Sequence, residues 1–297
     1  MTPFFVIAGP TAVGKSELAV QVAERCGAEI ISADAFQVYR GLDVLTAKPD
    51  AALRERVPHH LVGEIPLTAS FDTAKFLAAA TQRMREICER GRKVIVAGGT
   101  GLYIRALTHG LADIPAADEK LRSELSAQPL AELTQKLTEL DPAGASFIDL
   151  RNPRRVVRAL EICLLTGRPF SSFREEWNRP AAHIRGIILT RERAELCARI
   201  DARTDAMFAA GVEEEVRHCG ETGPTAAQMI GLREIRALMA GAMTRADCIA
   251  SIQQATRRYA KRQATWFRRE SAFTEMNLSH EKNAVDFVTR NARGAFC

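Results

Sequence analysis

The sequence predicts an α/β fold, in which a parallel sheet flanked by helices is interrupted by an all-helical insertion. In the first hundred residues, short apolar runs alternate with segments of helical spacing, an order typical of helix-covered parallel sheets. From about Pro115 to Pro180 no convincing strand pattern is present, and leucines recur at helical spacing. We therefore expect an α/β core with C-terminal helices in residues 1–114 and 183–297, and a helical insertion domain in residues 115–182.

The first element is an apolar strand at residues 4–8, followed by a glycine-rich loop and a helix that stops near Gly27. The loop fits the pattern G-x-x-x-x-G-K-[ST], and we call it the phosphate loop: Gly9, Pro10, Thr11, Ala12, Val13, Gly14, Lys15 and Ser16. In this order of elements, backbone N–H groups and the helix N-terminus attract phosphate oxygens. Lys15 adds a positive charge and the Ser16 hydroxyl can bind Mg²⁺. The sequence thus predicts a P-loop-type sheet that binds a polyphosphate or diphosphate.

A second strand, residues 29–33, ends at Asp34, and a third, residues 93–97, is followed by Gly98-Gly99-Thr100-Gly101. An amphipathic helix over residues 71–90 connects them. Because ligands bind at the carboxyl ends of parallel strands, we expect Asp34 and the Thr100 hydroxyl at the same sheet edge as Lys15. Asp34 is a candidate Mg²⁺ ligand, general base or turn cap. The glycines allow a ligand to approach the backbone closely.

In the insertion, short helices break at Pro129 and Pro142, and a helix over residues 154–166 ends at Gly167. A late strand at residues 184–189 follows, and the remainder reads as helical. Two basic clusters stand out: Arg151, Arg154, Arg155 and Arg158, and then Arg257, Arg258, Lys261, Arg262, Arg268 and Arg269. The second cluster contains no acid, and at a helical turn of about 100° per residue it spans an arc of roughly 140°. Such a stripe favours an RNA or DNA surface over a merely solvated face, although Arg158 is also placed to pair with Glu161.

Composition narrows the class of protein. The chain has 297 residues, 46% of them apolar, and a net charge of +5. It has no apolar run long enough to cross a membrane and no basic leader before the first strand. Its seven cysteines form no C-x-x-C pair, which disfavours a disulfide framework or a cysteine zinc site. We expect a cytoplasmic monomer without membrane contact, in which the adjacent His59 and His60 are structural.

Several spaced motifs together resemble the bacterial tRNA dimethylallyltransferase family, also called isopentenyl-diphosphate:tRNA transferases. They are the phosphate loop, Ser32-Ala33-Asp34, Gln37-Val38-Tyr39-Arg40-Gly41, Thr46-Ala47-Lys48-Pro49, Pro58-His59-His60-Leu61, Gly98 to Ile104, Asn152-Pro153-Arg154-Arg155, Thr166-Gly167-Arg168-Pro169, Gln228 to Glu234 and Arg258 to Arg268. The resemblance runs from Val6 to about Arg269. The chain departs from the family at Ala35, Leu45 and Leu232, where Ser, Gly and Tyr are usual.

The resemblance implies transfer of a dimethylallyl group from dimethylallyl diphosphate to the exocyclic amine of the adenosine beside the tRNA anticodon, giving N6-isopentenyladenosine. The implied catalytic residues are Asp34, as general base, and Thr100. The implied diphosphate site is the phosphate loop with Arg203, and Mg²⁺ near Ser16. The implied contacts to the anticodon stem-loop are Asp34, Ala35, Phe36, Gln37, Thr100, Arg122, Asn152, Pro153, Arg154, Arg155, Val156, Gln228, Met229, Ile230, Gly231, Leu232, Arg233, Lys261, Arg262, Gln263, Ala264, Thr265, Trp266, Phe267 and Arg268.

Two other functions use the same loop. A P-loop small-molecule kinase would bind ATP there but would not need the acid-free basic segment. A nucleic-acid-binding ATPase would need that segment and also a residue that positions water, which the sequence does not reveal. Preference for ATP or for an allylic diphosphate separates these functions.

Overall fold

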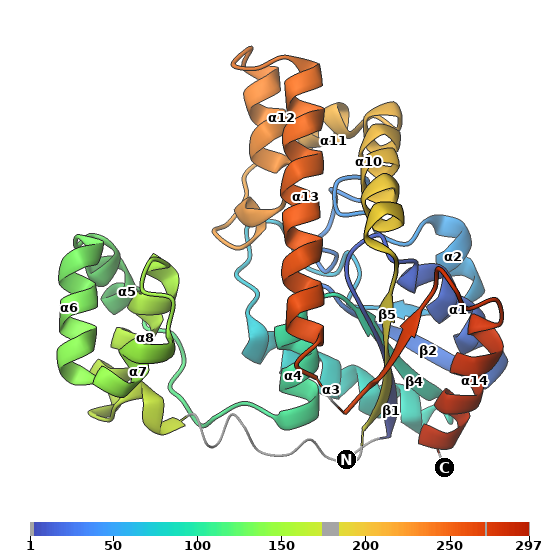
Figure 1. Cartoon of the computed structure of the whole chain (residues 1–297), viewed down its shortest axis with the longest axis horizontal. Helices are drawn as coiled ribbons and strands as arrows, with labels where there is room; N and C mark the ends of the chain where they lie inside the picture. Colours follow the sequence, from blue (N-terminus) through green and yellow to red (C-terminus); the bar gives the residue numbers. More distant parts are fainter. Residues whose placement is uncertain (1–2, 174–183, 271, 297) are drawn as a thin grey trace. The chain divides into compact units, whose positions relative to one another are not determined.

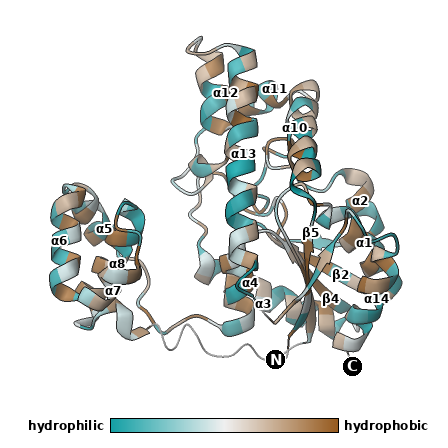
Figure 2. Cartoon of the chain, in the orientation of Figure 1, coloured by the Kyte–Doolittle hydropathy of each residue, from teal (hydrophilic) through white to brown (hydrophobic). Residues whose placement is uncertain are grey.

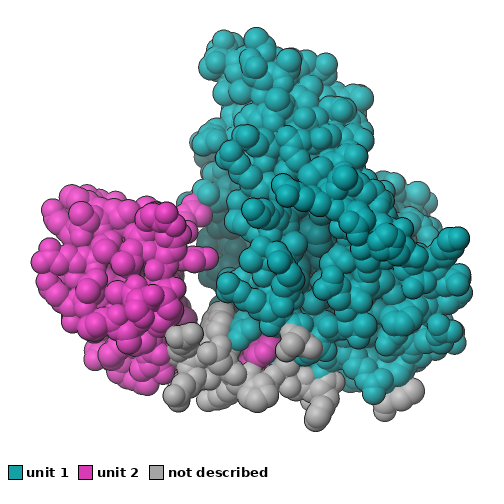
Figure 3. All heavy atoms as spheres, viewed as in Figure 1, with its two compact units in different colours: residues 1–108, 183–297 teal, residues 109–182 magenta. Residues whose placement is uncertain are grey.

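The computed structural model describes residues 3–173, 184–270 and 272–296, and it divides into two compact units (Figures 1 and 3). Unit 1 comprises residues 1–108 and 183–297, and unit 2 comprises residues 109–182. Within the described residues, no helix is long and apolar enough to cross a membrane.

The sheet of unit 1 has six strands, all parallel, in the order β3-β2-β4-β1-β5-β6. The strands are β1 (Phe4–Ala8), β2 (Ala28–Ala33), β3 (His59–His60), β4 (Lys93–Gly98), β5 (Arg185–Thr190) and β6 (Thr274–Asn277). The predicted α/β fold class is confirmed. Neither edge strand was predicted from the sequence, because β3 has only two residues and β6 reads Thr-Glu-Met-Asn, without the apolar run of a central strand.

Helices cover both faces of the sheet. The helices of unit 1 are α1 (Lys15–Cys26), α2 (Ala51–Arg56), α3 (Thr73–Glu89), α4 (Gly101–His109), α10 (Arg193–Ala209), α11 (Val212–His218), α12 (Leu232–Met239), α13 (Arg245–Phe267) and α14 (Ala284–Ala295), with a 3-10 turn, η2 (Ala226–Gln228). Alternate β1 residues enter two cores: Phe5 and Ile7 pack with α1 and α14, whereas Phe4 and Val6 pack with α3 and α4. This alternation is what a central strand buried on both faces requires.

Backbone geometry at both ends of α1 places the phosphate loop. Gly14 precedes the helix with φ 109°, and Gly27 ends it with φ 64°. Both angles lie in a region that residues with a Cβ rarely adopt. No side chain caps the first turn of α1, so its backbone N–H groups face the loop.

Unit 2 is a small helical bundle with its own core. Its elements are α5 (Glu119–Ser126), α6 (Leu130–Leu140), α7 (Pro142–Phe147), α8 (Pro153–Thr166) and the 3-10 turn η1 (Phe170–Phe173). The helix ends predicted at Pro129, Pro142 and Gly167 are confirmed. Asp141 is buried and accepts hydrogen bonds from Gly144 N, Ser171 N and Ser171 Oγ, which joins the start of α7 to η1.

Candidate functional site

The Lys15 side chain folds back over the phosphate loop. Its Nζ donates to Gly9 O at 3.0 Å and to Pro10 O at 2.8 Å. Burial, opposed by the negative charge of Asp34 and assisted by the positive charge of Arg203, lowers the pKa of Lys15 to about 8. A bound anion would restore a full charge on this amine, because an opposite charge favours the protonated form.

Three arginines hold the outer side of the loop: Arg191, just after β5, and Arg199 and Arg203 on α10. Arg203 donates to Thr11 Oγ1 at 2.8 Å, Arg199 to Ala12 O at 2.8 Å and Arg191 to Val13 O at 2.8 Å. Burial lowers the pKa of Arg203 and the positive charge of Arg199 adds to this, against the negative charge of Asp34. The sequence analysis assigned a role only to Arg203. The i, i+4 spacing on one helix face could have added Arg199, whereas nothing in the sequence singles out Arg191.

Asp34 directly follows β2 and serves as a turn cap. Its Oδ1 accepts from Phe36 N at 2.9 Å and from Gln37 N at 3.3 Å, as in an Asx-turn. Among the described residues, no hydrogen bond is made to its Oδ2. The turn-cap and general-base interpretations are therefore compatible, since each needs a different carboxylate oxygen.

Thr100 is joined to the same turn. Its Oγ1 accepts from Ala35 N at 3.0 Å, and its own N–H donates to Ala33 O at 3.1 Å. A Cβ on Gly98 would lie 2.2 Å from Ala33 O, so glycine is required where the ends of β2 and β4 meet. Asp34 and Thr100 thus lie together at the carboxyl edge of the sheet, as their positions in the sequence predict.

The Gln37 amide is occupied within the protein. Its Nε2 donates to Ala47 O at 3.0 Å and Thr46 O at 3.4 Å, and its Oε1 accepts from Ser32 Oγ at 3.1 Å. Gln37 therefore anchors the loop of residues 42–48 to β2. Contact with an adenine, which the resemblance implies, would use the remaining lone pair of Oε1 or exchange one of these bonds.

The glycine turn after β4 is covered by protein. A Cβ on Gly99 would lie 2.4 Å from Gln263 Nε2, and a Cβ on Gly101 would lie 2.1 Å from Trp266 Cδ1. From the sequence, these glycines are predicted to admit a ligand. At Gly99 and Gly101 they instead admit side chains of α13, whose C-terminal end lies beside α4 in Figure 1.

The basic stripe of α13 is largely exposed, and Figure 2 shows this helix hydrophilic over much of its visible face. Arg258, Lys261 and Arg262 lie exposed on the helix, and Arg268 follows it. Arg257 differs, because it pairs with Asp201 of α10. The side chains of two of the implied RNA contacts are buried: Gln263 and Phe267 are 6% and 1% exposed, because both face the core of unit 1.

The Gln228–Arg233 segment also contains both exposed and buried side chains. Gln228 and Arg233 are exposed, whereas Met229 and Leu232 are 3% and 1% exposed. Gly231 is also buried, with φ 97°, and a Cβ there would lie 2.8 Å from Leu45 Cδ1. The departures from the family at Leu45 and Leu232 thus fall on core positions.

In unit 2, the Asn152-Pro153 motif starts a helix. Asn152 Oδ1 accepts from Arg155 N at 3.4 Å and caps α8. Arg154 and Arg155 are exposed, while Val156 is fully buried in the core of unit 2.

The implied RNA contact Arg122 is held by a buried carboxylate. Arg122 Nε lies 3.0 Å from Glu161 Oε2, and Arg158 NH1 lies 2.6 Å from the same oxygen. Arg158 is therefore an internal ion-pair partner, and Arg122 remains 41% exposed on its outer side.

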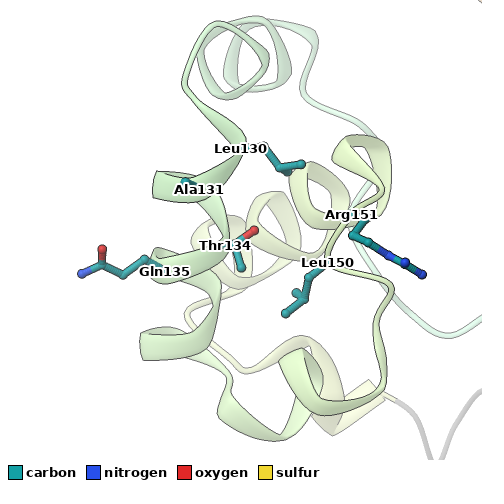
Figure 4. A pocket seen from close by; sticks show the side chains of 6 residues that line it. All are labelled: Leu130, Ala131, Thr134, Gln135, Leu150 and Arg151. Carbon is teal, nitrogen blue, oxygen red and sulfur yellow. The ribbon is translucent and has the colours of Figure 1, made fainter.

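A shallow hollow beside α6 is lined by Leu130, Ala131, Thr134, Gln135, Leu150 and Arg151 (Figure 4), and it contains none of the predicted catalytic residues.

The donor set at the sheet edge suits a cation shared with a substrate. In the described part of the chain, no cluster of three or more His, Cys, Asp and Glu side chains can hold a metal ion by itself. Ser16 lies in the first turn of α1, next to Lys15. Mg²⁺ in proteins commonly takes one or two side-chain oxygens, with phosphate oxygens and waters completing its shell. A Ser16 hydroxyl beside a bound diphosphate fits this coordination preference.

Comparisons with known proteins agree with one another. The model of the IPP transferase family matches residues 37–270. The tRNA dimethylallyltransferase of Geobacter metallireducens is 44% identical over 280 residues, 91% of each chain, and that of Akkermansia muciniphila is 42% identical over 273 residues, 92% of each chain.

Solved structures are also similar. The tRNA isopentenylpyrophosphate transferase of Bacillus halodurans has a TM-score of 0.72 at 37% identity, over 100% of this chain and 97% of that one. A eukaryotic dimethylallyltransferase acting on tRNA has a TM-score of 0.83 at 25% identity, over 100% of this chain and 79% of that one. On this evidence, and with its phosphate loop and sheet-edge carboxylate, the chain belongs to the IPP transferase family.

Proposed function

We propose that this protein is a tRNA dimethylallyltransferase. It transfers the dimethylallyl group of dimethylallyl diphosphate to the exocyclic amine of the adenosine adjacent to the anticodon. The observation that carries this proposal is the meeting of three parts at one sheet edge: the phosphate loop, the Asp34–Thr100 turn and the basic helix α13. Each part serves one requirement of the reaction: leaving-group binding, proton removal and RNA binding.

The leaving group sets the first requirement. When the adenine amine attacks C1 of the dimethylallyl group, the C1–O bond breaks and diphosphate departs with the electron pair. The free N–H groups at the start of α1, Lys15 and Arg203 stabilise the charge that develops on it. To do so, the Lys15 amine exchanges its bonds to Gly9 O and Pro10 O for bonds to phosphate oxygens. Mg²⁺, when bound near Ser16, would supply further charge neutralisation there.

The attacking amine sets the second requirement. The new N–C bond leaves a surplus proton on the nitrogen, and we assign that proton to Asp34 Oδ2, because Oδ1 is occupied by two backbone N–H groups. Thr100 is held by Ala35 N, and we assign its hydroxyl proton to an oxygen of the substrate. The target adenine has to leave its stack to reach these groups, as bases of single-stranded loops can.

The anticodon arm sets the third requirement. We assign its phosphates to the exposed cations Arg258, Lys261, Arg262 and Arg268, and to Arg154 and Arg155 of unit 2. Exposed arginine and lysine side chains suit phosphodiester contacts because they lose little solvation before pairing. We also propose that the protein works as a cytoplasmic monomer.

The test is incubation with radiolabelled dimethylallyl diphosphate, Mg²⁺ and unmodified tRNA, followed by counting of label in the RNA. We expect label that disappears when the adenosine beside the anticodon is changed. Unlabelled RNA with consumption of ATP would instead establish the kinase or ATPase alternative. The acid-free basic stripe disfavours the kinase, and the names of the relatives disfavour both.

A further inference from the structure

One buried side chain of α13 bonds two loops of the reaction centre at once. Gln263 is 6% exposed, and its Oε1 accepts from Thr11 N of the phosphate loop at 2.9 Å. Its Nε2 donates to Gly99 O of the glycine turn at 2.8 Å. No other residue type of similar length offers both an acceptor and a donor at the end of an uncharged chain.

Its neighbours on the same helix face reinforce this contact. Tyr259, four residues earlier, lies near Thr100, and burial raises the pKa of its phenol. Trp266, three residues later, lies where a Cβ of Gly101 would be. Residues at these spacings share one helix face, so the inner face of α13 is fitted to the glycine turn.

Thr11 is held from two sides. Gln263 takes its backbone N–H, while Arg203 donates to its Oγ1 at 2.8 Å. The Thr11 amide is therefore engaged within the protein. The diphosphate is left to the amides nearer the start of α1.

We infer that Gln263 is a positioning residue for the transfer reaction. By bridging Thr11 N and Gly99 O, it sets the spacing between the leaving-group site and the turn that carries Thr100. It also docks the helix with the RNA-facing cations onto that pair of loops. The inference rests on the proposed function, and it removes Gln263 from the RNA contacts.

Two substitutions separate the bridge from simple packing. Gln263→Glu keeps an acceptor for Thr11 N but sets a carboxylate oxygen against the carbonyl of Gly99. Gln263→Met fills a similar volume and loses both bonds. Gln254→Glu is the matched control, because Gln254 lies exposed on the same helix and the charge change is the same.

The readouts are the tRNA dissociation constant, the dissociation constant of inorganic pyrophosphate and the single-turnover rate with both substrates saturating. We expect both Gln263 variants to bind tRNA within about threefold of the wild type, because affinity comes from the exposed cations. The single-turnover rate should fall by about 10- to 100-fold, the scale on which misplaced reacting groups lose rate. Pyrophosphate should bind more weakly, and Gln254→Glu should behave as the wild type.

Two results of the rate and tRNA-binding measurements would overturn the inference. One is a single-turnover rate within about threefold of the wild type, the change expected from losing one weak hydrogen bond. The other is loss of tRNA binding, by misfolding or by a missing contact, since the inference separates Gln263 from RNA affinity. If the wild type transfers no dimethylallyl group, the proposed function fails. If instead pyrophosphate binding is unchanged in both Gln263 variants, the positioning role of Gln263 is rejected and the proposed function is not affected.

Discussion

The two oxygens of Asp34 can be separated by substitution. Asp34→Asn retains an Oδ1 that accepts from Phe36 N and Gln37 N, but its amide cannot take a proton at the second position. Asp34→Ala removes both functions. The pair of variants therefore distinguishes loss of the turn from loss of the base.

The expected magnitudes differ for folding and for rate. In Asp34→Ala, losing the cap should cost about 1–2 kcal/mol of unfolding free energy, which lowers Tm by about 2–8 °C for a unit of this size. Asp34→Asn should melt close to the wild type. Both should lose at least ~10²-fold in turnover, equivalent to about 2.7 kcal/mol in activation free energy.

The assay is single-turnover transfer with saturating substrates, beside a thermal melt. The pH should lie below 7, because loss of the Asp34 charge lowers the pKa of Lys15 further and would otherwise weaken diphosphate binding. A turnover of Asp34→Asn within about tenfold of the wild type would contradict the general-base assignment, since a positioned base contributes 10²–10⁴.

Three further predictions concern charge. The KM for dimethylallyl diphosphate should rise about tenfold between pH 7 and pH 9, because Lys15, with a pKa of about 8, loses its proton there; Lys15→Arg should show no such rise in a pH profile. The double variant Lys261→Gln/Arg262→Gln should reduce the slope of log affinity for tRNA against log salt concentration by about 1.4–1.8. The control Lys75→Gln/Arg85→Gln on α3 should leave this slope unchanged. An unchanged slope in the Lys261/Arg262 variant would refute phosphate contacts by these two residues. Glu161→Ala should destabilise unit 2 by about 2 kcal/mol. This is less than the about 3–5 kcal/mol lost when a fully buried ion pair is broken, because Arg122 and Arg158 are partly exposed. Amide hydrogen exchange in α5 and α8 measures the loss of stability, and unaltered protection there would contradict the prediction.

Local patterns in the sequence predicted much of the fold and the core of the site. The order of strand, glycine loop and helix determined where Lys15 and Ser16 lie, because these elements depend on neighbouring residues. Asp34 and Thr100 were predicted to share an edge because both directly follow parallel strands. The helix breaks at Pro129 and Pro142 and the helix stop at Gly167 followed from proline and glycine at helix ends.

The tertiary structure alone decided what fills the space around those residues. The charge stripe indicates an exposed face of α13, but only the packing shows that Gln263 and Phe267, which the resemblance implies as RNA contacts, have buried side chains. The glycines of the β4–α4 turn read as room for a ligand, and only the packing of α13 showed that Gln263 and Trp266 occupy part of that room. Contacts between residues more than 160 positions apart, such as Gln263 with Gly99, leave no periodic trace in either segment, because they depend on how the sheet brings distant parts of the chain together.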